Sequence, residues 1–175
     1  EKIILSNGLT VALDQKPQVH SAAVSIFVAA GNRFENFEFC GASHFIEHMV
    51  FKGTASKTSE DIARESDMMG GQLNAYTTKE DTTLHATVLR RDFQRAVELI
   101  ADVMFHSTFP DRELCKEREV IADEINSYKD SPSERIYDDF EDLIFSGSEL
   151  GHNILGSKAS IARFDSAALR RFVER

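Results

Sequence analysis

The sequence has few of the residues that mark special classes of protein. Its 175 residues include 2 cysteines, 3 prolines, 9 glycines and no tryptophan. Two cysteines do not make a disulfide framework, so Cys40 and Cys115 are interpreted as two buried thiols without a functional role. The low proline and glycine content excludes collagen-like and low-complexity chains. The composition is therefore that of an ordinary globular protein.

Long hydrophobic runs are also missing. One of the longest, residues 22–30, is about half of the roughly 20 residues that a membrane-spanning helix needs, so no transmembrane segment is predicted. No secretory or transit segment is visible either, and the first residue is not methionine. An intracellular location, such as a bacterial cytoplasm or a mitochondrial matrix, is favoured, but the sequence leaves the compartment open.

Positive charge is in deficit. The formal net charge is −9, and no stripe of lysine and arginine stands out along the chain. Nucleic-acid-binding surfaces usually show a basic patch, so that class of function is not expected. An acidic surface is compatible with basic substrates, although it also serves solubility.

The apolar pattern first predicts strands. Residues 2–5 and 9–13 surround a turn that contains Asn7 and Gly8, and residues 22–30 have the profile of a central strand buried on both faces. Residues 72–78 and 82–89 are predicted as an adjacent strand pair, because the second segment alternates and is rich in threonine and valine.

The remaining segments predict helices. They lie at residues 43–51, after a capping box of Thr58 and Asp61 as far as Gly70, at 91–106, after an Asp111 cap as far as about 129, at 133–145, and from 165 or 166 onward. This order predicts one α+β domain over residues 1–175, with helices against a mainly antiparallel sheet. Because no strand follows the last helix, we expect a fragment of a longer protein.

The strongest functional signal is His44-Phe45-Ile46-Glu47-His48. Two histidines four residues apart project from one helix face about one turn apart, which allows both imidazoles to bind one zinc ion. Glu47 is placed to approach a metal-bound water, in an order that inverts the commoner H-E-x-x-H motif. The flanking residues are apolar, and burying two histidines and a glutamate without a partner is costly, so a metal would supply one.

A catalytic zinc ion usually has three protein ligands and one open position. The predicted helix after Asp111 offers Glu117, Glu119, Asp123 and Glu124. Glu117 and Glu124 are seven residues apart and share nearly one face, so one can bind the metal while the other orients a histidine or the water. Spacing alone leaves the choice between them open.

Four stretches, in order along the chain, carry a specific resemblance: residues 41–54, 70–78, 117–125 and 150–156. With them the chain resembles the pitrilysin and insulin-degrading-enzyme family of inverted-motif zinc peptidases. Within that family it is most similar to the branch of the catalytic (beta) subunits of mitochondrial processing peptidases and their bacterial relatives.

The resemblance implies one zinc ion per chain, held by His44, His48 and Glu124. The family's third ligand lies about 76 positions after the second histidine, and here 124 − 48 = 76. Glu117 then corresponds to a supporting glutamate. The implied chemistry is that zinc lowers the pKa of a bound water and polarises the scissile carbonyl, while Glu47 takes the water's proton and passes it to the leaving amine.

The segment Asn74, Ala75, Tyr76 and Thr77 has two interpretations. From the sequence alone it is the start of a strand after a pair of glycines. In the family the matching segment is an edge strand to which the substrate adds as a further strand, held by main-chain hydrogen bonds. The resemblance therefore implies that these four residues bind substrate.

The implied function is a zinc-dependent metalloendopeptidase that acts on peptides or precursor proteins. Family members consist of two related halves, so a second homologous half or subunit is expected as a partner, and the chain alone is expected to be weak or inactive. One alternative is a non-catalytic scaffold or partner subunit, against which the full set of His44, Glu47, His48 and Glu124 argues. A structural zinc site is the other, and the incomplete ligand set beside Glu47 argues against it.

Overall fold

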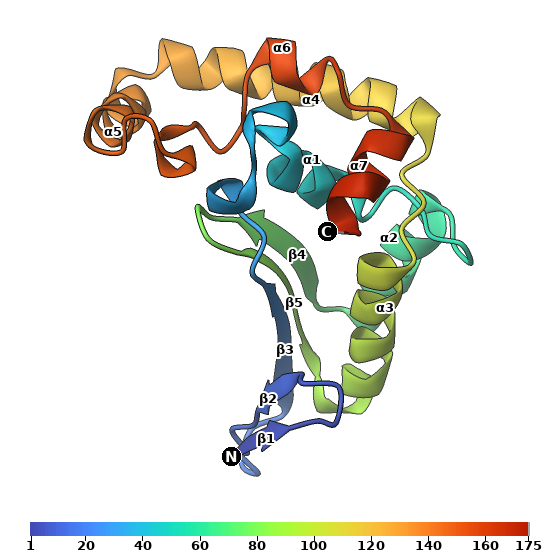
Figure 1. The fold of residues 1–175 in the computed structure, drawn as a ribbon. Helices are drawn as coiled ribbons and strands as arrows, with labels where there is room; N and C mark the ends of the chain where they lie inside the picture. Colours follow the sequence, from blue (N-terminus) through green and yellow to red (C-terminus); the bar gives the residue numbers. More distant parts are fainter. Residues whose placement is uncertain (175) are drawn as a thin grey trace.

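A three-stranded antiparallel sheet forms one layer of the molecule (Figure 1). The structure is a computed structural model that describes residues 1–174. The sheet contains β3 (Ser21–Val28), β4 (Gln72–Thr77) and β5 (Thr82–Leu89), in the order β3-β5-β4. The hairpin of β1 (Lys2–Ile4) and β2 (Thr10–Ala12) pairs separately, around a turn in which Gly8 has a φ of 89°.

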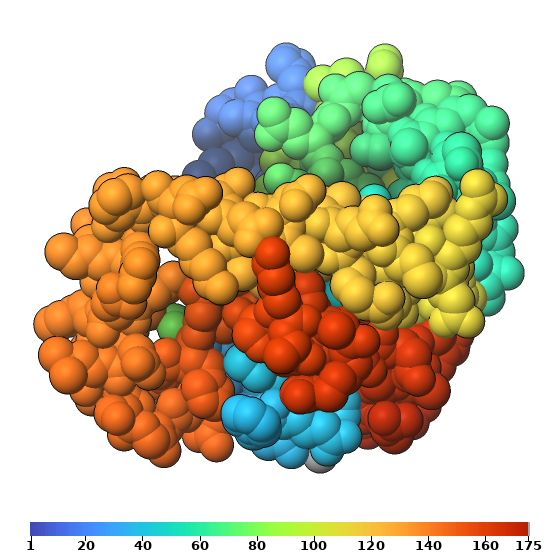
Figure 2. Space-filling model, turned by 90° about the horizontal axis from the view of Figure 1, so that it is seen from above, coloured from blue at the N-terminus to red at the C-terminus, as the bar shows by residue number. Residues whose placement is uncertain are grey.

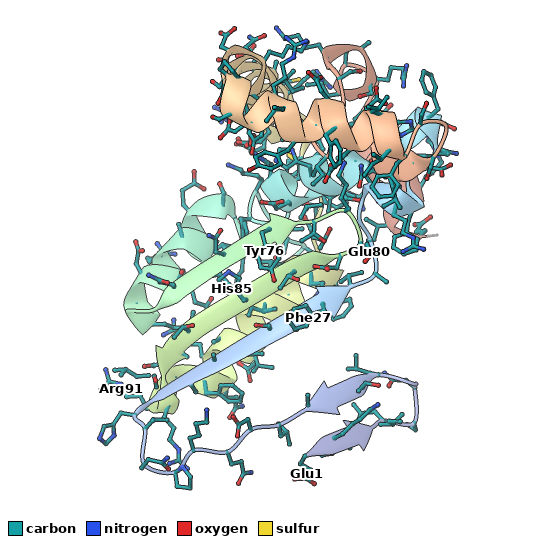
Figure 3. The ribbon with its side chains drawn as sticks, turned by 90° about the vertical axis from the view of Figure 1, so that its left-hand side faces the viewer. Glu1, Phe27, Tyr76, Glu80, His85 and Arg91 are labelled. Atoms are coloured by element: carbon teal, nitrogen blue, oxygen red, sulfur yellow. The ribbon has the colours of Figure 1, made fainter. Side chains whose placement is uncertain are left out.

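The prediction of a central strand at residues 22–30 is wrong. Within the described residues β3 lies at an edge and pairs only with β5, and its side chains alternate between exposed and half-buried. Phe27 is 69% exposed, and Figure 3 shows it with His85 and Tyr76 on the face of the sheet that points away from the helices. The apolar content of residues 22–30 is a weak sign of burial, because four of the nine residues are alanines. Alanine has little apolar area, so its exposure costs little free energy.

Helices cover the other face of the sheet and its upper end (Figure 1). α3 (Phe93–Phe105) packs on β5 and β3, α2 (Ser59–Met69) lies against α3, and α1 (Ala42–Met49) contacts β4 and β5. The other helices are α4 (Asp111–Asp130), α5 (Pro132–Ile144), α6 (Lys158–Ile161) and α7 (Ser166–Val173), with 3₁₀ turns at Asn32–Phe34, Phe37–Phe39, Arg90–Asp92 and Glu149–Gly151. The α+β fold with a mainly antiparallel sheet is confirmed. Within residues 1–174, none of the helices combines the length and hydrophobicity needed to cross a membrane.

Side-chain caps begin two of the predicted helices, α2 and α7. The capping box of Thr58 and Asp61 is present, and Asp165 caps α7 by accepting a hydrogen bond from the Ala168 N–H at 2.6 Å. The predicted Asp111 cap is wrong: Asp111 is the first helical residue, and Pro110 occupies the N-cap position. A proline before the helix fixes φ and ends the extended segment without a side-chain cap.

α1 lies between two apolar cores. Phe45 and Met49 are fully buried in the first, which α4, α6 and α7 complete. Val50, just after the helix, belongs to the second, formed by the sheet with α2 and α3. Ile46 packs against both. Packing on two sides therefore holds this short helix in place.

Two further features concern Asp102 and the two cysteines. Asp102 on α3 accepts hydrogen bonds from the Thr54 hydroxyl at 3.0 Å and from Lys57 Nζ at 3.1 Å, which ties the loop after α1 to α3. Both cysteines are free, and the prediction that both are buried is wrong, because Cys115 is exposed. Cys40 is half-buried, and burial raises the pKa of its thiol to about 11.

Candidate metal centre

The two motif histidines lie on α1 and Glu124 lies on α4, and these two helices are neighbours (Figure 1). Glu124 Oε2 lies 3.6 Å from His44 Nε2 and 3.6 Å from His48 Nε2, and one donor atom from each residue lies within 4.8 Å of the other two. Separations of 3.6 Å are too long for hydrogen bonds. They are close to the roughly 3.3 Å between two ligands of a tetrahedral zinc ion with bonds of about 2.0–2.1 Å. Two imidazole nitrogens and one carboxylate oxygen therefore fit zinc in both chemistry and spacing.

His44 has the more buried imidazole. The residue is 7% exposed, and burial, followed by the charge of His48, lowers the pKa of His44 to about 4. Its ring is therefore neutral at neutral pH, with a lone pair available for a metal. Its Nδ1 is buried and has no hydrogen-bond partner among the described residues.

His48 is held from the opposite side of its ring. Glu117 Oε2 lies 3.0 Å from His48 Nδ1, and Lys52 Nζ lies 2.7 Å from Glu117 Oε1. Burial alone would raise the pKa of Glu117, but the hydrogen bonds from Lys52 and His48 outweigh burial and leave that pKa below its usual value. A charged Glu117 favours the His48 tautomer that carries its proton on Nδ1, which leaves Nε2 free to face Glu124.

Glu47 lies beside this cluster rather than in it. Its Oε2 is buried without a hydrogen-bond partner among the described residues. Burial raises the pKa of the Glu47 carboxyl, and hydrogen bonds from Thr77 and the charge of His48 oppose that rise. The carboxyl is thus oriented by β4 and retains a free oxygen, as a group that exchanges protons requires.

The four predicted substrate-binding residues all lie in β4, which pairs with β5 on one side only within the described residues. The Ala75 side chain is buried, whereas Asn74 is exposed and Tyr76 is 43% exposed. Asn74 Oδ1 accepts a hydrogen bond from the Ala75 N–H at 2.9 Å. Thr77 is the member of this segment that interacts with Glu47.

Three contacts of the site were missed by sequence reasoning: Lys52 to Glu117, Thr77 to Glu47, and Glu35 to the start of α1. Lys52 lies in the Phe-Lys-Gly-Thr stretch that carried part of the family resemblance, so a signal for it existed. Thr77 is 30 residues away from Glu47 in the sequence, and Glu35 is six and eight residues before Gly41 and Ser43. Neither contact follows a motif or a helical spacing, so the sequence alone gives no indication of them.

A cavity of about 450 Å³ lies between α4, α5 and the segment that follows α5. Figure 2 shows a hollow between these segments when the molecule is viewed from above. Its wall carries three carboxylates, Asp138, Asp139 and Asp142, with Arg135 paired to Asp139 at 3.4 Å. Ile125, the residue after Glu124 on α4, also lines it.

Comparison with known proteins identifies the family. The sequence profile of the insulinase family, peptidase family M16, matches residues 10–158. A Bacillus subtilis protein named uncharacterized zinc protease YmxG is 40% identical over 167 residues, which cover 95% of this chain and 41% of that protein. An Arabidopsis thaliana protein named probable mitochondrial-processing peptidase subunit beta is 34% identical over 170 residues, or 97% of this chain and 32% of that protein.

Solved structures show the same fold. The inactive domain of a peptidase M16 protein from Pseudomonas fluorescens superposes with a TM-score of 0.92 at 18% identity, over 99% of this chain and 42% of that one. A Helicobacter pylori protease superposes with a TM-score of 0.88 at 24% identity, over 98% of this chain and 42% of that one. The chain thus spans about two fifths of the length of these proteins. The family resemblance seen in the sequence is confirmed, and the chain belongs to the insulinase family, peptidase family M16.

Proposed function

We propose that this chain is the zinc-binding catalytic part of a metalloendopeptidase. The observation that carries the proposal is the convergence of His44, His48 and Glu124 beside the half-buried Glu47, whose Oε2 is buried without a hydrogen-bond partner among the described residues. A structural zinc site usually has four protein ligands, whereas three ligands leave a position for water or substrate. One zinc ion per chain is expected, and the names of the relatives support that choice of metal.

The side chains divide the work. Zinc, when bound, supplies Lewis-acid chemistry, which activates water and polarises a peptide carbonyl. Glu47 accepts a proton at its free Oε2 and later donates it to the departing amine. Glu117 orients His48, and Thr77 orients Glu47.

The free edge of β4 is the proposed substrate strand. A peptide that adds to this edge would be held through its main chain, which every sequence shares, so cleavage would tolerate many side chains. The Ala75 N–H already bonds to Asn74 Oδ1, so an incoming carbonyl at that position has to replace the amide of Asn74. Ala75→Pro removes this donor and should weaken cleavage. Proline substitutions along β4 that leave cleavage unchanged would contradict the proposed strand.

Basic peptides or precursor segments are the proposed substrate class. The formal net charge is −9, and the cavity beside α4 carries three aspartates against one arginine and one lysine. Because the chain spans about two fifths of its relatives, efficient cleavage is proposed to require a second homologous half or partner subunit.

Metal analysis with two matched variants tests the proposal. Purified protein should contain about one zinc per chain by plasma mass spectrometry. Glu124→Gln should lose most of the zinc, because an amide is a poorer ligand than a carboxylate. Glu47→Gln should keep the zinc but abolish peptide cleavage in the protein that carries its second half. Wild-type protein that takes up no zinc, or an active Glu47→Gln variant, would overturn the proposal.

A non-catalytic partner subunit is the competing function, since the fold also occurs in the Pseudomonas fluorescens domain described as inactive. The fold is common to both possibilities and does not separate them. The ligand cluster and Glu47 favour catalysis, because a scaffold has no need to keep a buried carboxylate oxygen without a partner beside two histidines and a glutamate.

A further inference from the structure

Glu35 reaches the start of α1 from outside the helix. The residue is 1% exposed, and its two carboxylate oxygens accept hydrogen bonds from the main chain: Oε2 from the Gly41 N–H at 2.7 Å, and Oε1 from the Ser43 N–H at 2.6 Å. The first N–H groups of a helix have no partners within it and carry partial positive charge. A carboxylate at this position satisfies two of those donors and complements the charge.

The N-cap residue of α1 cannot supply this cap itself. Gly41 has no side chain, and its φ of 89° is in the left-handed region. A Cβ added there would lie 2.8 Å from the Leu155 carbonyl oxygen and 2.9 Å from Gly156 Cα, so the backbone leaves no room for a capping serine or aspartate. The helix that carries the metal motif therefore takes its cap from a residue six positions upstream.

Glu35 is itself fixed in place. It directly follows the 3₁₀ turn Asn32–Phe34, whose Arg33 N–H donates to the Lys79 carbonyl at 2.9 Å. Asn32 is 1% exposed, and its amide donates to the His152 carbonyl at 2.5 Å. These contacts anchor the turn to two other segments of the chain, so the carboxylate has a defined position relative to the rest of the fold.

Ser43 immediately precedes His44, and the whole of α1 has only eight residues. A shift or unwinding of its first turn would move His44 directly, with few helical bonds to resist it. We propose that Glu35 is a positioning residue for the metal centre, which holds the first turn of α1 so that His44 points at Glu124. The inference rests on the proposed function, since it concerns the same ligands.

Zinc affinity and the cobalt spectrum of Glu35→Gln test this role. The variant keeps the size of the side chain but replaces one acceptor oxygen with an amide NH2 group. This donor would face a main-chain N–H, which is also a donor. We expect it to stay folded, to bind zinc roughly tenfold more weakly, and to give an altered visible spectrum with cobalt in place of zinc. Glu38→Gln is the charge-matched control, because Glu38 is exposed and three residues away. If Glu35→Gln does not fold, Glu35→Asp is measured by the same criteria.

Hydrogen exchange separates this inference from the proposed function. Without metal, Glu35→Gln should accelerate amide exchange in the first turn of α1 relative to α3. Wild-type protein that binds no zinc would overturn the proposed function and with it the role of Glu35 at the metal, whereas unchanged exchange in the first turn of α1 of Glu35→Gln would overturn the inference alone. A merely structural residue would lower the melting temperature but leave the zinc affinity and the cobalt spectrum unchanged. That result in a folded variant would overturn the inference.

Discussion

The hydrogen bond between Glu117 and His48 predicts a measurable loss of zinc affinity when Glu117 is replaced. Glu117 Oε2 lies 3.0 Å from His48 Nδ1, and the Glu117 side chain is 10% exposed. Hydrogen bonds to charged groups contribute about 1.5–3 kcal/mol. Because the bond exists with and without zinc, only the part that strengthens on metal binding changes the affinity. If that part is half, about 0.75–1.5 kcal/mol, zinc binding weakens by a factor of roughly 4 to 13.

Two substitutions grade the effect. Glu117→Gln keeps an oxygen that accepts from Nδ1–H but loses the charge, so we expect about tenfold weaker binding; Glu117→Ala should approach about 100-fold. Competition with a chromophoric chelator measures both. Glu119→Gln is the control, since it removes the same charge from an exposed position on the same helix. A folded Glu117→Gln variant with wild-type affinity would refute the reasoning, and so would an equal loss in Glu119→Gln.

Two further predictions concern stability. Asp102→Asn should lower the free energy of unfolding by about 2 kcal/mol in urea denaturation. Burial raises the pKa of Asp102. Hydrogen bonds from Lys57, Thr54 and Ser56 outweigh burial and leave that pKa below its usual value. This stabilisation is therefore complete above the unfolded pKa of about 3.9 and is lost as the pH falls through the lower folded pKa, so the two proteins should converge in acid. Gly41→Ala should lower the free energy of unfolding by about 3 kcal/mol or more, because φ is left-handed and the added Cβ would lie 2.8–2.9 Å from backbone atoms. Gly70→Ala should lower it by only about 1 kcal/mol, because φ is 61° but nothing lies within 4 Å of the added Cβ. Equal costs at the two glycines would show that the close contacts do not matter.

The metal motif could be predicted because its information is local. His44 and His48 are four residues apart, and the apolar residues between and after them place both on a buried helix. The third zinc ligand could not be predicted in this way, because helix periodicity left Glu117 and Glu124 equivalent. Only the family resemblance separated them. In the structure Glu124 faces the Nε2 atoms of both histidines, while Glu117 faces Nδ1 of one. That distinction depends on how α4 crosses α1, which spacing within α4 does not encode.

The errors have the same origin. Residues 22–30 were predicted as a buried central strand from their apolar content, but burial is decided by neighbouring strands and helices, and β3 has a partner on one side only within the described residues. Glu35 was not identified because an acidic residue in a loop is usually solvated. Its burial depends on a turn anchored to residues more than forty and one hundred positions away. The helices and strands could be predicted from local periodicity. The polar residues that support the site could not, because tertiary contacts decide which of them are buried next to it.

Removal of the metal should lower the stability of the chain without unfolding it. The proposed ligands lie on helices that apolar contacts already hold, since Phe45 and Met49 on α1 and Ile121 on α4 are fully buried. Bound zinc adds RT ln(1 + [Zn]/Kd), about 2.7 kcal/mol at 100 times Kd, to a fold that exists without it. Chelation should thus leave the far-ultraviolet circular dichroism at room temperature unchanged, with a melting temperature that rises as zinc is added back. A structural zinc site would behave differently, because its binding energy is folding energy and the apo chain would lose its helical signal. Unfolding by the chelator would therefore contradict a catalytic site, and a melting temperature indifferent to zinc would contradict binding at His44, His48 and Glu124.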